Sequence, residues 1–142
     1  MAATRQDSLG FLLADVSRLM RRAFKERLRG SSLTQAQARA LVYIARNEGV
    51  RQVDLAELLE IQPITLARVL DHLVEAGMVE RRADPRDRRV FRVHLKAAAA
   101  PHLAEIERVA SKIRGTAFRD LSPKQAELVH KALCTMRENL AS

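Results

Sequence analysis

Cysteine and aromatic residues are scarce in this sequence of 142 residues. Its one cysteine, Cys134, excludes an intramolecular disulfide, and nothing in the sequence points to an oxidising compartment. Tryptophan is absent and aromatic residues make up 4% of the chain, which argues against a stacking platform for single-stranded nucleic acid. The apolar content of 47% is enough to bury a continuous core without a disulfide or a metal.

Long apolar runs are also missing. In the first twenty residues, Asp15 and Arg18 interrupt the apolar stretch too early for a signal-peptide core or a membrane span. No other part of the chain approaches twenty consecutive apolar residues. We therefore expect a soluble protein of the reducing cytoplasm that does not bind a membrane and has lost no targeting segment.

Catalytic and metal-binding motifs are absent as well. The chain has no G-x-S-x-G, H-E-x-x-H or phosphate-loop motif. Its histidines have no metal-ligand spacing with one another or with Cys134, and no recognised pattern places a histidine beside this cysteine. The four histidines are His72, His94, His102 and His130. The sequence therefore predicts a protein that is not an enzyme and uses neither a metal nor a cofactor.

Positive charge is what the sequence has in excess. Its 25 lysines and arginines outnumber its 17 aspartates and glutamates, which gives a formal net charge of +8. Most of these cations are arginines, whose planar guanidinium matches phosphate groups and guanine edges better than an ammonium group does. Together with the scarcity of aromatic residues, this excess favours duplex DNA over RNA as the partner.

Apolar residues recur at three- and four-residue spacing over most of the chain, which predicts amphipathic helices. Thr34 with Gln37, and Ser122 with Gln125, form the sequence pattern of a capping box at the start of two of them. The helices are expected at residues 8–29, 34–46, 53–59, 63–76, 97–121 and from 123 onward. Between residues 78 and 95 the period changes to two, which predicts a basic β-hairpin. The predicted fold class is mainly α with a small β-hairpin.

The order of these elements predicts a winged helix-turn-helix domain at residues 31–98. An N-terminal helix in residues 1–30 and two C-terminal helices in residues 99–142 flank it. Residues 33–95 can close their own small core, but each flanking helix carries an apolar stripe that the rest of the chain is too short to cover. Because pairing with a second copy covers these stripes most simply, we expect a homodimer formed by the flanking helices.

The helix that starts after Gln62 has a polar face opposite its leucine stripe. Thr65, Arg68 and His72 lie on that face. Such a helix, placed second after a tight turn, suits insertion into a major groove, where Arg68 can fork onto a guanine. Gln62 or Thr65 can bond a base edge or a phosphate. The alternative is that these residues are ordinary solvated positions of a surface helix.

Residues 80–89 of the hairpin are rich in arginine. An arginine at the turn and others along the strands can reach a minor groove and grip the flanking phosphates. Asp84 and Asp87 are expected to pair with neighbouring arginines and to fix the turn, without contacting DNA themselves. The predicted DNA-binding arginines of the hairpin are Arg86, Arg88 and Arg89. The alternative is a solvated charged loop.

The stretch LAELLEIQPITLARVLDHLVEAGMVERR runs directly into DPRDRR. It resembles the recognition helix and the D-x-R-D-x-R wing of the MarR family of bacterial regulators, and within that family the SlyA-like branch. The resemblance implies that Pro63, Thr65 and Arg68 lie in the DNA-reading helix. It also implies that Arg86 enters the minor groove at the wing tip. Three further residues would be structural polar residues of the wing: Asp84, Asp87 and Arg89.

Two departures from the family pattern affect the ends of helices. Leu95 is followed by Lys96 and four alanines where the family often has L-T-x-x-G, so the junction to the next helix lacks its usual cap and turn glycine. Arg51 stands where a serine or threonine would cap the third helix. Neither departure changes the prediction of a DNA-binding protein.

The resemblance implies a transcriptional regulator, a repressor or an activator, that binds a pseudo-palindromic duplex site as a homodimer. It also implies modulation by a small aromatic or phenolic acid in the cleft between the dimerisation helices and the DNA-binding domain. Arg18 or Arg22 are candidates to meet the carboxylate of this effector. One alternative is an architectural protein that coats DNA without sequence preference. Another is a helical adaptor that binds only proteins, which would leave the arginine-rich hairpin without a purpose.

Overall fold

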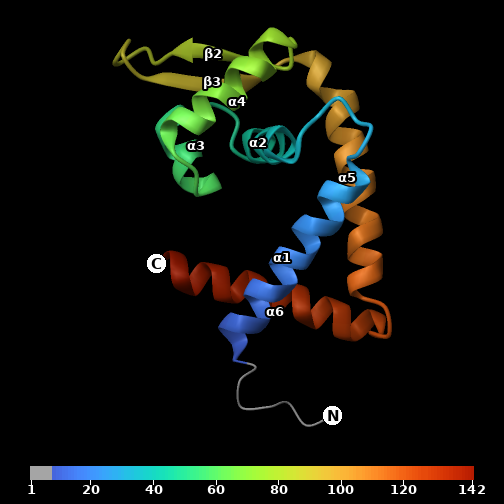
Figure 1. The fold of residues 1–142 in the computed structure, drawn as a ribbon. Coiled ribbons are helices and arrows are strands. Elements are labelled where there is room, and N and C mark those ends of the chain that lie inside the picture. The colour runs from blue at the N-terminus through green and yellow to red at the C-terminus, as the bar shows by residue number, and fades with distance from the viewer. Residues whose placement is uncertain (1–7) are drawn as a thin grey trace.

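The computed structural model describes residues 8–142, so the part of the predicted N-terminal domain in residues 1–7 lies outside the described residues. The elements follow the predicted order, with helices before and after a small sheet (Figure 1). They are α1 (Leu9–Arg27), α2 (Gln35–Arg46), β1 (Val50–Arg51), α3 (Gln52–Leu59), α4 (Pro63–Glu75), β2 (Val79–Ala83), β3 (Phe91–Leu95), the 3-10 turn η1 (Ala97–Ala99), α5 (Ala100–Ala117) and α6 (Pro123–Ala141). Among the described residues, no helix is both long and apolar enough to cross a membrane.

Both predicted capping boxes are present, at the starts of α2 and α6. Thr34 Oγ1 accepts a hydrogen bond from the backbone N–H of Gln37 at 3.2 Å, and Gln37 Oε1 accepts one from the N–H of Thr34 at 3.0 Å. Ser122 and Gln125 make the same exchange at 3.1 and 2.9 Å. Because each box satisfies donors that a helix leaves unpaired in its first turn, the local sequence fixes these two starts.

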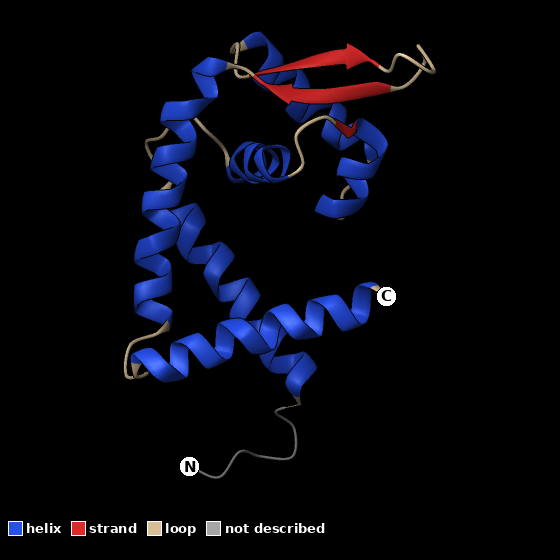
Figure 2. Cartoon of the chain, turned by 180° about the vertical axis from the view of Figure 1, so that it is seen from behind, coloured by secondary structure: helices blue, strands red, loops and turns tan. Residues whose placement is uncertain are grey.

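The predicted hairpin consists of β2 and β3, which pair antiparallel over their full length. The structure adds a strand that the sequence did not reveal, because β1 pairs with Arg92 and Val93 of β3 and gives the strand order β1-β3-β2. Figure 2 shows this sheet in red at the end of the molecule opposite α6. Two residues are too few to show an alternating pattern, so β1 left no period in the sequence.

Helices α2, α3 and α4 and the sheet enclose one apolar core. Its largest fully buried side chains come from all of these elements: Leu41, Ile44, Leu55, Leu66, Leu70, Leu73, Val79 and Val93. Residues 33–95 supply most of this core, as the sequence predicts, and Leu28, Ala99 and Ile106 of the flanking segments add to it. Burial of its leucines holds α4 with one face inward and the opposite face toward solvent.

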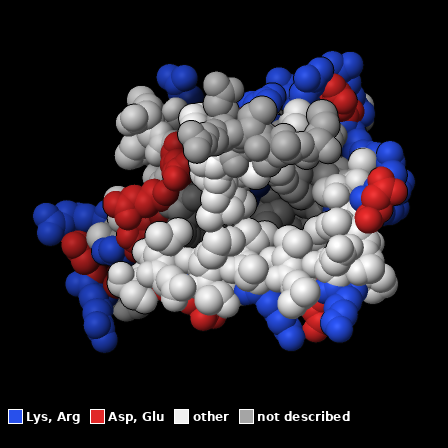
Figure 3. Space-filling view, turned by 90° about the horizontal axis from the view of Figure 1, so that it is seen from below, with Lys and Arg blue, Asp and Glu red and all other residues white. Residues whose placement is uncertain are grey.

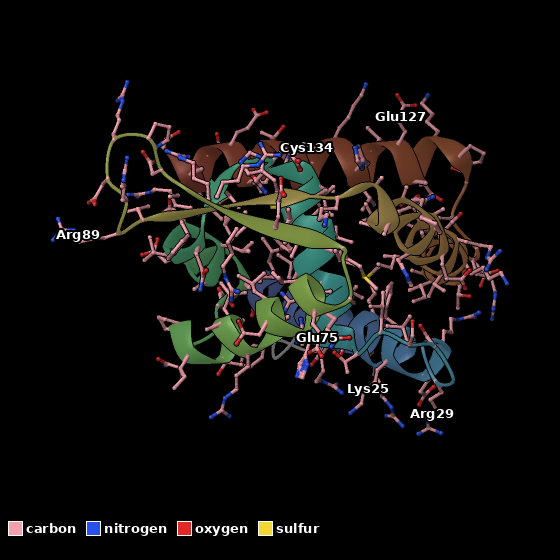
Figure 4. All side chains as sticks on the ribbon, turned by 90° about the horizontal axis from the view of Figure 1, so that it is seen from above. Lys25, Arg29, Glu75, Arg89, Glu127 and Cys134 are labelled. Carbon is pink, nitrogen blue, oxygen red and sulfur yellow. The ribbon has the colours of Figure 1, made fainter. Side chains whose placement is uncertain are left out.

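The flanking helices lack such cover. Helix α1 packs along α5, whereas α6 lies on the other side of the molecule when it is seen from above (Figure 4). Within the described chain, neither α1 nor α6 has a buried residue. Their apolar side chains with exposures between 41% and 68% include Phe11, Leu13, Val16, Leu19, Leu128 and Leu133. From below, the surface at this end is hollowed, and its visible middle is mainly uncharged, with Lys, Arg, Asp and Glu side chains around the edge (Figure 3).

Candidate nucleic-acid interface

Helix α4 presents the predicted reading residues to solvent. Proline is tolerated in the first turn of α4, because the N–H that it lacks would have no helical partner there. The N-cap, Gln62, makes no side-chain capping bond, so its amide is available to a ligand. The predicted residues of this helix and its cap are all exposed: Gln62, Pro63, Thr65, Arg68 and His72. The structure therefore brings them together at one end and along the outer side of α4.

The N-terminus of α2 adjoins this outer side. Thr34 and Gln37 line a shallow hollow of about 240 Å³ together with Thr65, Arg68 and His72 of α4. From the sequence, Thr34 and Gln37 were assigned only to the capping of α2, and their position beside α4 was missed. A helix N-terminus carries a partial positive charge, so this position suits a phosphate beside the groove that α4 would enter.

The turn of the wing is built around Asp84, which is only 7% exposed. Its Oδ1 accepts the backbone N–H of Arg86 at 2.8 Å, and its Oδ2 accepts the Nε–H of Arg92 at 2.7 Å. The hydrogen bond from Arg86 and then that from Arg92 hold the pKa of Asp84 below its ordinary value, although burial acts in the opposite direction. The charged carboxylate therefore ties the turn to β3.

Both wing aspartates pair with arginines, but over different sequence distances. Asp87 Oδ1 accepts the backbone N–H of Arg89 at 3.1 Å and its Nε–H at 3.2 Å. The partner of Asp84 is Arg92, which sequence reasoning did not single out and which also donates from Nη1 to the carbonyl of Gly49 at 2.9 Å. The register of the hairpin determines this pairing across the strands, so no local spacing rule predicts it.

The three predicted wing arginines face solvent. Arg86, Arg88 and Arg89 are exposed. The side chain of Arg89 is 92% exposed despite its contact with Asp87, and it lies at the outer end of the wing in Figure 4. Among the described residues, the side chains of Arg86 and Arg88 form no hydrogen bond or ion pair with the protein. Their donors are therefore free for an external anion.

The wing and the reading helix meet at a hollow of about 270 Å³. Pro63 at the start of α4 lines it together with Arg89 and Phe91 of the wing. Gln52 and Val53 of α3 complete this side of the surface. The outer side of α4 and the wing thus form one continuous surface that carries arginines at both ends.

The start of α3 is held by an ion pair in place of a cap. The N-cap is Arg51, which makes no side-chain capping bond. Its Nε and Nη2 donate to Asp54 Oδ2 and Oδ1 at 2.7 and 3.1 Å. This bidentate contact lowers the pKa of Asp54 and raises that of Arg51. Asp54 also places negative charge at the positive end of the helix, so the departure at Arg51 has a local substitute.

A separate hollow of about 270 Å³ lies between α1, α2 and α5. Its apolar lining includes Met20, Phe24, Val42, Ile106, Ala110 and Ile113. Its polar lining consists of two cations, one carboxylate and two neutral residues: Arg21, Arg39, Glu107, Gln35 and Tyr43. The guanidinium of Arg39 lies 5.9 Å from the centroid of the Tyr43 ring. An apolar hollow with a few cations suits an aromatic ring that carries an acidic group.

The arginines at this hollow are not the predicted ones. Arg18 and Arg22 form ion pairs with acidic residues of α1 itself, both at 3.6 Å, and neither lines the hollow. Residues two positions apart on a helix point in directions that differ by about 200° around its axis. Met20 and Phe24, two positions after Arg18 and Arg22, line the hollow. Arg18 and Arg22 therefore face away from this hollow, and the arginines that line it are Arg21 of α1 and Arg39 of α2.

His130 and Cys134 lie one turn apart on α6, where Figure 4 labels the cysteine. Cys134 Sγ is 3.8 Å from His130 Nε2. A spacing of four residues places two side chains on the same helix face, so this neighbour was predictable from the sequence. In the part of the chain that the structure describes, no three His, Cys, Asp or Glu side chains come together as a metal site.

Comparison with known proteins gives concordant matches. Residues 33–91 match the model of the MarR family. A crystal structure of MarR matches with a TM-score of 0.87 and 28% identity over 99% of this chain and 96% of that one. Wild-type MarR from E. coli in its apo form matches with a TM-score of 0.81 and 25% sequence identity. The match covers 94% of this chain and 98% of that one. The transcriptional regulator SlyA matches with a TM-score of 0.75 and 23% sequence identity over 94% of each chain. This match shows the common fold alone, so membership of the SlyA-like branch stays a prediction.

Proposed function

Since the chain belongs to the MarR family, whose members are transcription regulators and not enzymes, we propose that it regulates transcription by binding a pseudo-palindromic duplex site as a homodimer. The observation that carries this proposal is the continuous surface formed by α4 and the wing. We assign residues 31–98 to DNA binding and residues 1–30 and 99–142 to dimerisation. The site of action is the cytoplasm, where a single unpaired cysteine stays reduced.

In this proposal α4 enters the major groove. Arg68 then faces base edges, where its fork suits guanine, while Gln62 and Thr65 lie near the groove edge and the phosphates. The wing follows the strand to the adjacent minor groove, with Arg86 at its tip. Arg88 and Arg89 meet phosphates on either side, which accounts for their exposure.

The homodimer follows from the uncovered apolar faces of α1 and α6. A two-fold axis through these helices places the same patch on both protomers in contact. It also presents two copies of α4 to one side of a duplex. Two reading helices need half-sites about 34 Å apart, one helical turn, and their symmetry predicts an inverted repeat.

The hollow between α1, α2 and α5 is the proposed site of a small aromatic or phenolic acid. Its apolar lining accommodates the ring, and Arg21 or Arg39 meets the acid group. The hollow touches both a dimerisation helix and α2, whose N-terminus borders α4. Filling it therefore changes how the reading helices are held relative to the dimer. A thermal-shift screen of such acids, with Arg39→Ala as the variant, tests this part separately from DNA binding.

The experiment that tests the function is a fluorescence anisotropy titration. The probes are a duplex selected by the protein from a random library and a shuffled duplex of the same composition. We expect preference for the selected duplex, reduced about tenfold or more by Arg68→Ala, because one bidentate base contact contributes about 1–3 kcal/mol. Arg108→Ala on α5 removes the same charge away from α4 and the wing and leaves the preference unchanged. Equal affinity for both duplexes would favour the architectural alternative, and no binding to either would favour the adaptor.

A further inference from the structure

Strand β2 carries two adjacent arginines that have opposite surroundings. The side chain of Arg82 is 59% exposed and donates from Nε to Glu80 of its own strand at 2.7 Å. The side chain of Arg81 is 23% exposed, and this residue lies opposite the fully buried Val93 in the register of the hairpin. Because neighbouring strand residues point to opposite faces, Arg81 lies on the face that covers the core and Arg82 on the outer face.

Arg81 connects the sheet to both helices of the helix-turn-helix. Its Nε donates to Gln52 Oε1 of α3 at 3.1 Å. Its Nη2 donates both to the carbonyl oxygen of Ala67 at 3.1 Å and to Asp71 Oδ1 at 2.8 Å, and both acceptors lie in α4. Ala67 immediately precedes Arg68, the candidate base-reading residue. The contact therefore holds the backbone of α4 at the helical turn that carries Arg68.

These contacts supply what the leucine stripe of α4 lacks. Apolar burial is non-directional and leaves small rotations and slides of a helix inexpensive, whereas the donors of a guanidinium are fixed in a plane. A recognition group must be held within about 0.5 Å and 10–20° to read its target. Asp71 is a carboxylate at the flank of the reading face, with 67% of its side chain exposed, and pairing with Arg81 also offsets its repulsion of phosphate.

We propose that Arg81 is a positioning residue for DNA recognition. It fixes the orientation of α4 relative to the wing and so sets discrimination between sequences, without touching DNA. This inference rests on the proposed function, because it assumes that α4 reads bases. It predicts that loss of Arg81 weakens binding to the selected duplex and spares the electrostatic binding that any duplex receives.

The test uses the full chain, the selected duplex and the shuffled duplex of the same composition, each titrated at several salt concentrations. Arg81→Met is expected to lower the selected-to-shuffled affinity ratio about tenfold, because it removes hydrogen bonds made by a charged group. Arg81→Lys keeps the positive charge but not the planar guanidinium. Its selected-to-shuffled affinity ratio is expected to fall nearly as far as that of Arg81→Met. Arg82→Met is the matched control, with an unchanged ratio expected.

Each outcome decides between positioning and contact. An unchanged ratio in Arg81→Met overturns the inference. A second result also overturns the inference: equal weakening on both duplexes, with the slope of log affinity against log salt concentration reduced in magnitude by about 0.9. That result would make Arg81 a phosphate contact. If Arg81→Met does not fold, Asp71→Asn replaces it, since that side chain is mostly exposed, and an unchanged ratio there has the same meaning. Failure of the unaltered protein to prefer any selected duplex would instead overturn the proposed function, and the inference with it.

Discussion

The two ends of this molecule differ in what covers their apolar side chains. In the winged domain large apolar side chains from three helices and a sheet, such as Leu41, Leu66 and Val93, are fully buried against one another. In α1 and α6 no residue is buried, although both helices carry rows of leucine and other apolar side chains. The first end is complete within one chain. The second end has the composition of a core but only half of its contacts, which is the pattern expected of an obligate interface.

The ion pairs differ in the same way. In the winged domain Arg92 reaches Asp84 across the hairpin and Arg81 reaches Asp71 on another element. In α1 and α6 the pairs are local, three or four residues apart, as in Lys131 with Glu127. Local surface pairs contribute only about 0.3–0.5 kcal/mol each. The pairs between elements fix orientation, and they occur where the proposed function needs it.

The largest expected effect comes from placing a charge on the uncovered end. Leu133→Asp on α6 is expected to reduce the mass in solution from twice 16.0 kDa to 16.0 kDa, because a buried unpaired carboxylate is incompatible with an apolar interface. Affinity for the selected duplex falls by about a hundredfold or more, since two linked half-sites no longer bind together. Light scattering and anisotropy measure the two effects.

Leu58→Asp on α3 is the matched control for that change. Leu58 is 45% exposed and Leu133 is 42% exposed, so the two substitutions place the same charge at similarly exposed leucines in the two ends. Only the α6 change is expected to alter the mass. If the unaltered protein is already a 16.0 kDa monomer, or if both substitutions dissociate it, the contrast between the two ends is wrong.

The second effect concerns arginines. Arg86→Ala at the wing is expected to weaken binding to the selected duplex about ten- to a hundredfold, the range for one well-placed groove contact. Arg108→Ala on α5, where the side chain pairs with Glu105, is expected to have no measurable effect. Anisotropy titrations of both variants measure this difference. Equal losses would show that net charge, and not its placement in the wing, determines affinity.

Much of this architecture was predictable from the sequence because it is encoded locally. The capping boxes at Thr34 and Ser122 mark helix starts, and the change of period at residue 78 marks the hairpin. The exposed face of α4 around Arg68 follows from one helical period, since the buried leucines define the opposite face. The uncovered stripes of the flanking helices are visible in the same way.

The features that sequence reasoning missed depend on contacts between elements. The roles of Arg81 and Arg92 follow from the hairpin register and from the packing of α4, and neither leaves a spacing signal. The strand β1 is too short to have a period. Sequence reasoning singled out Arg18 and Arg22, and not the arginines that line the hollow between α1, α2 and α5, because helical periodicity defines a polar face but does not say which neighbour covers the residues beside it. Arg21 lies at that boundary.

The third effect concerns the pH dependence of the wing. The pKa of Asp84 is held below its ordinary 3.8, first by the hydrogen bond from Arg86 and then by that from Arg92. Its contribution to stability is therefore complete above about pH 4 and is lost as the pH falls through the lower folded-state value. The gap in unfolding free energy between the native protein and Asp84→Asn should shrink between pH 6 and pH 3 in urea titrations. Glu127→Gln in α6 is the control for loss of one carboxylate, and a constant gap for Asp84→Asn would contradict the prediction.

The smallest effect uses the two capping boxes, one at each end of the molecule. Thr34→Ala and Ser122→Ala each remove one capping oxygen and are each expected to cost about 1 kcal/mol in the native protein. In the Leu133→Asp background the stability costs of these two substitutions should differ. The core still holds α2, so Thr34→Ala keeps its cost, whereas α6 has lost its partner and Ser122→Ala costs less than about 0.5 kcal/mol. Urea unfolding of the four variants measures this coupling, and equal costs in both backgrounds would mean that α6 is stable without a second copy.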